Sequence, residues 1–144
     1  MVTIPLVKKD SVVNRAYKFE ENPFTEVYID VNYKCNMSCP MCYSDTPLGA
    51  QATVPDLDLD YYEEFCAKLP QPIIIPMVGG EPTISKHILK IIEITHKYGH
   101  MAFMSTNGRR FAQSLDFTKR FAEVAKKGNT RIHIDISGGY NDDY

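Results

Sequence analysis

The feature that most limits the fold is an alternation of short apolar segments with amphipathic ones. The run Ile73–Val78 is apolar and β-branched, which is typical of a strand buried on both faces of a parallel sheet. We predict further strands at Thr25–Tyr33, Met101–Ser105 and Arg131–Ser137. Strand–helix units in series form parallel sheets with right-handed crossovers, so the pattern predicts an α/β fold.

Three helices are predicted between these strands. The first opens at Asp60 with a capping box, and its inner face would carry Tyr62, Phe65, Cys66 and Leu69. The second covers 84–98 and ends before Gly99, a typical residue after a helix. The third starts near Ser114 or Asp116 and stops at Gly128, with Lys126 and Lys127 in its last turn, where cations suit the helix dipole.

Composition sets the broad class of the protein. The chain has 144 residues, 44% of them hydrophobic and 24% charged, which indicates one globular domain. A net charge of −2 argues against binding to a nucleic-acid backbone, which needs a basic face. The N-terminus lacks the apolar core of a signal peptide, and Ile73–Val78 is too short to span a bilayer. We therefore predict a cytoplasmic protein whose thiols stay reduced.

Three cysteines gather in one segment, Cys35, Cys39 and Cys42, with C-x3-C-x2-C spacing. Iron–sulfur clusters normally take four cysteines, so three would leave one iron open to a small molecule, as a catalytic cluster requires. Two alternatives are cysteines that bind no metal and a zinc site, the latter completed by one of the histidines 87, 96, 100 and 133. Cys66 lies on an apolar helix face, where core packing is the expected role.

Polar motifs follow the other predicted strands. In Gly79-Gly80-Glu81-Pro82 the glycines would let the backbone approach a ligand, and the carboxylate would accept hydrogen bonds from an ammonium group. Ser105 and Asn107 offer a hydroxyl and an amide after the third strand. Both motifs also suit plain turns. Because ligands gather at the carboxyl ends of parallel strands, the motifs are nevertheless consistent with one site.

The last predicted strand has two distinct faces. Asp135 and Ser137 project to one side together with His133, and isoleucines project to the other: Ile132, Ile134 and Ile136. His133 is a candidate acid–base group or substrate contact, although a lone histidine is more often a structural residue.

Taken together, these motifs resemble the radical S-adenosylmethionine (radical SAM) enzymes. The resemblance runs from Thr25 to the C-terminus and implies a parallel βα partial barrel, TIM-like, with about four of the usual six strand–helix units. It implies a four-iron–four-sulfur cluster held by Cys35, Cys39 and Cys42. S-adenosylmethionine would bind the open iron and be cleaved reductively to a 5′-deoxyadenosyl radical. That radical would abstract hydrogen from a substrate that the sequence does not identify, in peptide modification or cofactor biosynthesis.

The same resemblance implies roles for residues at the strand ends. The amino group of S-adenosylmethionine would lie at Gly79, Gly80 and Glu81, and its adenine near Met41, where the family often has an aromatic residue. Ser105 and Asn107 would face the cosubstrate or the substrate. The family often has Ser-Leu-Asp-Gly where this chain has Asp-Ile-Ser-Gly, so either Asp135 or Ser137 would contact the ribose or carboxylate.

The resemblance divides the chain into an N-terminal segment, 1–24, and an incomplete core, 25–144. We expect a truncated chain, or a partner or second copy that completes the barrel, unless residues 2–24 close the sheet edge. A small electron-donor protein, flavodoxin- or ferredoxin-like, is the expected redox partner. The alternative function is a non-catalytic iron–sulfur or zinc module, which would not need Gly-Gly-Glu-Pro.

Overall fold

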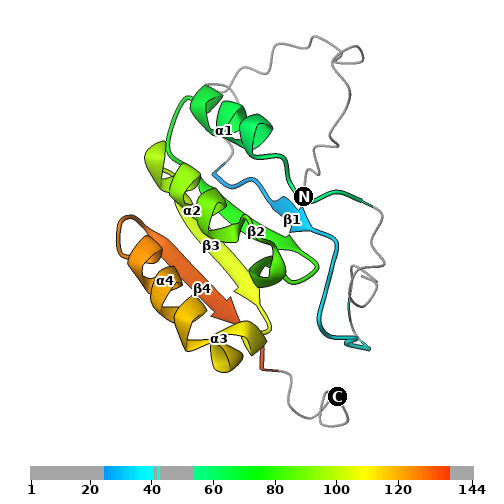
Figure 1. Cartoon of the computed structure of the whole chain (residues 1–144). Coiled ribbons are helices and arrows are strands. Elements are labelled where there is room, and N and C mark those ends of the chain that lie inside the picture. Colours follow the sequence, from blue (N-terminus) through cyan, green and yellow to red (C-terminus); the bar gives the residue numbers. More distant parts are fainter. Residues whose placement is uncertain (1–24, 41, 43–53, 137–144) are drawn as a thin grey trace.

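The fold is an open parallel sheet covered by helices. A computed structural model describes residues 25–40, 42 and 54–136 of the chain. The sheet contains four parallel strands in sequential order (Figure 1): β1 (Ile29–Asn32), β2 (Ile74–Gly79), β3 (Met101–Thr106) and β4 (Thr130–Ile134). The predicted α/β fold with parallel strands is therefore confirmed, and the open sheet is consistent with part of a TIM-like barrel.

The helices lie on one face of this sheet (Figure 1). They are α1 (Leu59–Lys68), α2 (Ile88–Lys97), α3 (Arg109–Gln113) and α4 (Leu115–Ala125), with a short 3-10 turn, η2 (Pro82–Ile84), after β2. Within the described residues, no helix is long and apolar enough to cross a membrane.

The core lies between the sheet and the helices. Alternate residues of β3, Ala102, Met104 and Thr106, are buried, and Met104 pairs in register with Met77 and Ile132. Paired residues of parallel strands project to the same face. The helix side of the sheet therefore carries the apolar set, filled further by residues from the helices: Tyr62, Cys66, Ile88, Ile91, Ile92, Phe117 and Phe121.

Several predicted boundaries are wrong. The α1 helix is capped by Asp58 rather than Asp60, because the Asp58 carboxylate accepts a hydrogen bond from the backbone N–H of Tyr61 at 2.8 Å. The α2 helix starts at Ile88 instead of residue 84, because Pro82–Ile84 forms the separate turn η2. The α4 helix stops at Ala125, so Lys126 and Lys127 lie after it, and α3 was not predicted.

The β4 strand is shorter than predicted and largely exposed. It ends at Ile134 instead of Ser137, and Ile132, Ile134 and Ile136 are 39%, 45% and 85% exposed. Ile132 and Ile134 lie on the helix side, as their register with Met104 and Thr106 shows. His133 pairs with Ser105 and projects to the opposite face.

Candidate cofactor-binding site

The three clustered cysteines lie on the segment that follows β1. Cys35 and Cys39 are half-buried and Cys42 is exposed; none of these described cysteines forms a disulfide. The backbone N–H of Cys42 donates to the carbonyl of Cys39 at 3.0 Å. Burial raises the pKa of the Cys35 thiol, and the nearby charges of Glu81 and Cys39 raise it further. Among the described residues, no three His, Cys, Asp or Glu side chains are grouped to hold a metal ion.

The two glycines at the end of β2 allow the chain to pass close to the cysteine segment. Gly79 has a φ of +108°, and a Cβ on Gly80 would lie 2.0 Å from the carbonyl oxygen of Lys34. The Gly80 N–H donates to Asn32 O at 2.8 Å, and the Glu81 N–H donates to Lys34 O at 2.7 Å. The glycines thus make room for the protein's own backbone next to Cys35, whereas the sequence pattern predicts that they make room for a ligand.

Glu81 lies at the centre of the hydrogen bonds that join the strand ends. Its side chain is 2% exposed. Its Oε1 accepts from Thr83 N at 3.0 Å, Thr83 Oγ1 at 2.5 Å and Thr106 Oγ1 at 2.6 Å. Its Oε2 accepts from Asn107 N at 2.8 Å. A carboxylate has about four acceptor positions, so this one is satisfied by donors within the protein.

Asn107 connects this centre to the cysteine segment. Its amide Nδ2 donates to Asn36 Oδ1 at 2.8 Å, and its Oδ1 accepts from Arg109 N at 3.0 Å. Arg109 Nη1 also donates to Asn36 O at 3.1 Å. Because Asn36 follows Cys35 directly, the end of β3 is bonded to the segment that carries the cysteines.

Several residues of this arrangement were missed by the sequence analysis. Asn32 is 1% exposed; its Nδ2 donates to Glu81 O at 3.0 Å, and its Oδ1 accepts from Lys34 N at 2.7 Å. Asn36 and Thr83 were also unremarked. Their position was the available signal, because each is polar and lies within or next to a motif at the end of a strand.

The remaining predicted site residues lie near the same edge of the sheet. Ser105 is half-buried, and His133 is exposed beside it in register. Asp135 is exposed just after β4, and its N–H donates to Thr106 O at 3.0 Å. Met41 and Ser137 lie outside the described residues.

An open pocket of about 540 Å³ lies between the cysteine segment and the end of β4. Met37 contributes from the cysteine segment, Asn107 from the end of β3, and Phe111 from α3. The wall on the β4 side is apolar, formed by Ile134 and Ile136.

Comparison with known proteins agrees with this arrangement of motifs on a parallel sheet. Residues 29–144 match the family model of the radical SAM superfamily. The chain belongs to the radical SAM superfamily. The predicted family is therefore confirmed, and it is a family of enzymes that generally use S-adenosylmethionine and a four-iron–four-sulfur cluster and need a reductant.

Curated radical SAM relatives match the same region at low identity. A 7,8-dihydro-6-hydroxymethylpterin dimethyltransferase from Methanocaldococcus jannaschii is 24% identical over 113 residues, which are 76% of this chain and 22% of that protein. A probable GTP 3',8-cyclase from Pyrococcus abyssi is 28% identical over 114 residues, 79% of this chain and 35% of that protein. The chain thus spans between a fifth and about a third of the length of these relatives.

The thiols on this segment are of the ligand type that the radical SAM cofactor requires. Three thiols lie on one segment outside any disulfide, at the edge of the sheet where parallel α/β proteins bind ligands. Thiolates are the usual ligands of iron–sulfur clusters. The buried Cys66 is the fourth cysteine, and it lies in the core cluster on α1.

Proposed function

We propose that this chain is a radical SAM core, residues 25–144, in which Cys35, Cys39 and Cys42 hold a four-iron–four-sulfur cluster. When bound, the cluster supplies the electron that cleaves S-adenosylmethionine into methionine and a radical that abstracts hydrogen from a substrate. The observation that supports this most directly is the chain of hydrogen bonds from Glu81 through Asn107 to Asn36. It joins the cysteine segment to the ends of two strands.

The residues at the end of β2 would bind the amino group of S-adenosylmethionine. Glu81 already accepts four hydrogen bonds from protein groups, so its carboxylate serves to position Thr106 and Asn107. The backbone carbonyls of Gly79 and Gly80 are the acceptors that we assign to the ammonium group.

The face of the sheet opposite the helices would hold the substrate. Ser105 and His133 project to that face next to each other, and Asp135 follows at the same edge. We propose that these groups contact the substrate or the cosubstrate, and that a small flavodoxin- or ferredoxin-like protein supplies the electron.

Anaerobic reconstitution with iron and sulfide tests the cluster assignment. The wild-type chain should turn brown, and replacing Cys35, Cys39 or Cys42 by alanine should abolish the visible absorption. Cys66→Ala is the matched control and should keep the colour. A colourless wild-type chain that binds one zinc ion, or a cluster that survives Cys42→Ala but not Cys66→Ala, would overturn the assignment.

A further inference from the structure

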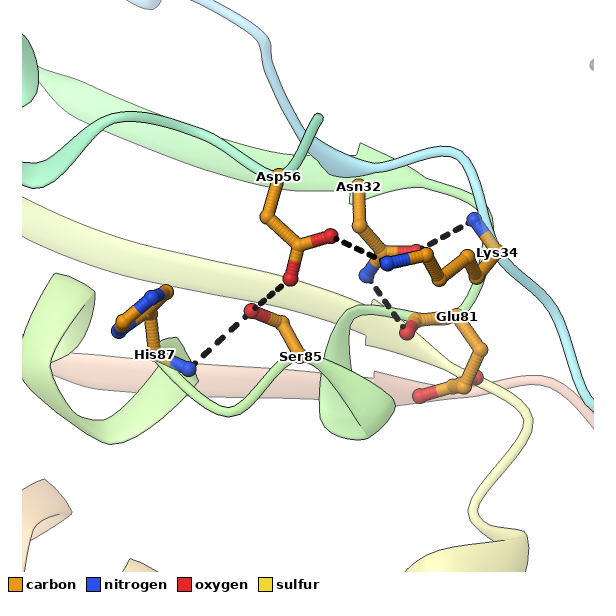
Figure 2. A network of polar contacts seen from close by, with 6 residues as sticks. All are labelled: Asn32, Lys34, Asp56, Glu81, Ser85 and His87. Carbon is orange, nitrogen blue, oxygen red and sulfur yellow. Dashed lines mark hydrogen bonds and ion pairs between the residues drawn. The ribbon is translucent and has the colours of Figure 1, made fainter. Parts of the chain in front are cut away.

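An ion pair lies at the start of the segment that carries the cysteines (Figure 2). Lys34, directly before Cys35, places Nζ 3.1 Å from Asp56 Oδ1. The other oxygen of Asp56 accepts a hydrogen bond from Ser85 Oγ at 3.2 Å, and Ser85 Oγ accepts one from His87 N at 3.2 Å. The network therefore connects the start of the cysteine segment, the residues before α1 and the turn before α2.

Both members of the pair are also anchored through the backbone. The carbonyl of Lys34 accepts a hydrogen bond from Glu81 N at 2.7 Å, next to β2. Leu57, the neighbour of Asp56, donates its N–H to Val31 O in β1 at 3.0 Å. Lys34 directly precedes Cys35, so the pair lies at the start of the segment that bears the cysteines.

The environment shields this pair only in part, so the attraction is sensitive to salt. The Lys34 side chain is 38% exposed and that of Asp56 is 18% exposed. The pair borders an open cavity of about 720 Å³, through which dissolved ions can reach it and screen the attraction. Fixing the Lys34 side chain also reduces the conformations available to its neighbour Cys35, because ordering one residue limits the freedom of the backbone next to it.

We propose that Lys34 and Asp56 are positioning residues whose ion pair retains the cluster by restraining the cysteine segment. This inference rests on the proposed function, since it requires that the cysteines hold a cluster. Groups that orient metal ligands from outside typically change metal affinity when they are mutated. The pair should therefore slow the loss of iron from the loaded protein, most strongly at low salt.

The experiment compares Lys34→Met, which keeps an apolar stem without the charge, with Lys34→Arg, which restores the charge. Lys90→Met is the matched control, because Lys90 forms an exposed ion pair with Glu93 on α2, at 3.6 Å. Each protein is reconstituted with iron and sulfide, and iron release to a chelator is followed at low salt and at about 0.5 M salt. Circular dichroism reports whether each variant is folded.

We expect Lys34→Met to lose iron about three- to fivefold faster than wild type at low salt, the upper range for an exposed ion pair. Lys34→Arg and Lys90→Met should match wild type, and high salt should remove most of the difference. If wild type holds a cluster but Lys34→Met releases iron no faster than Lys90→Met, the inference is wrong while the proposed function stands. If Lys34→Met does not fold, Asp56→Asn makes the same comparison. A wild-type chain without a cluster overturns both.

Discussion

Replacing Glu81 by glutamine tests whether its carboxylate holds the strand ends together. Glu81 is 2% exposed, and its carboxylate accepts four hydrogen bonds, three at Oε1 and one at Oε2. Glutamine has the same shape but offers one carbonyl oxygen and one NH₂ group. With its oxygen at the Oε1 position, its NH₂ would face the N–H of Asn107, and two donors would meet where a hydrogen bond had been.

The cost of this substitution follows from those contacts. Leaving the half-buried Asn107 N–H unsatisfied costs up to about 1–3 kcal/mol, and hydrogen bonds to a neutral oxygen are about half as strong as those to a carboxylate. Relief from burying a charge offsets part of this loss. We therefore expect Glu81→Gln to lower the free energy of unfolding by about 2–3 kcal/mol.

Urea unfolding of the cluster-free chain, followed by circular dichroism, measures this change. Glu93→Gln is the matched control, since Glu93 is a partly exposed carboxylate on α2 and should change stability by less than about 0.5 kcal/mol. Thr106→Val removes one donor to Glu81 and should cost about 1 kcal/mol, with less additional loss when combined with Glu81→Gln. A Glu81→Gln protein as stable as the Glu93→Gln control would refute the role of Glu81 as the link between strand ends.

Three further predictions concern other positions. Gly80→Ala should unfold at markedly lower urea than Gly99→Ala, because a Cβ on Gly80 would meet Lys34 O at 2.0 Å, whereas a Cβ on Gly99 meets no atom within 4 Å and brings only the strain of a φ of +77°; equal stabilities would contradict the close approach. Cys66 should resist alkylation in the folded chain while the exposed Cys42 reacts, because burial raises the pKa of Cys66 to about 11. Mass spectrometry of labelled peptides measures both alkylation rates, and equal rates for Cys66 and Cys42 would contradict this. Burial lowers the pKa of His96 below its ordinary value of about 6.5. As the pH falls, the unfolded chain therefore binds a proton at this histidine before the folded chain does, and stability should be lost below about pH 6.5. If the urea midpoint of His96→Gln falls with pH as much as that of wild type, this prediction is wrong.

Much of the fold could be predicted because it depends on local patterns. The apolar segments at β2 and β3 and the 3.6-residue periodicity of α2 and α4 indicate their own conformations. The wrong predictions concern the ends of elements, because neighbouring residues there are often equally suited to begin or end a helix. Asp58 and Asp60 are both good capping residues, and the hydrogen bond from Leu57 N to Val31 O fixes the chain directly before Asp58, which caps α1.

For the site, the sequence by itself determined which chemistry is present: three closely spaced cysteines, two adjacent glycines and a glutamate, each placed after a strand. Tertiary structure decided what those groups contact. Glu81 bonds to Thr106 and Asn107, Gly80 packs against Lys34, and Lys34 pairs with Asp56. These contacts join residues far apart in the chain, so they depend on the register of the strands and the path of the connecting segments. Local patterns carry no information about either, because hydrogen bonds between distant residues form only once the sheet has aligned them.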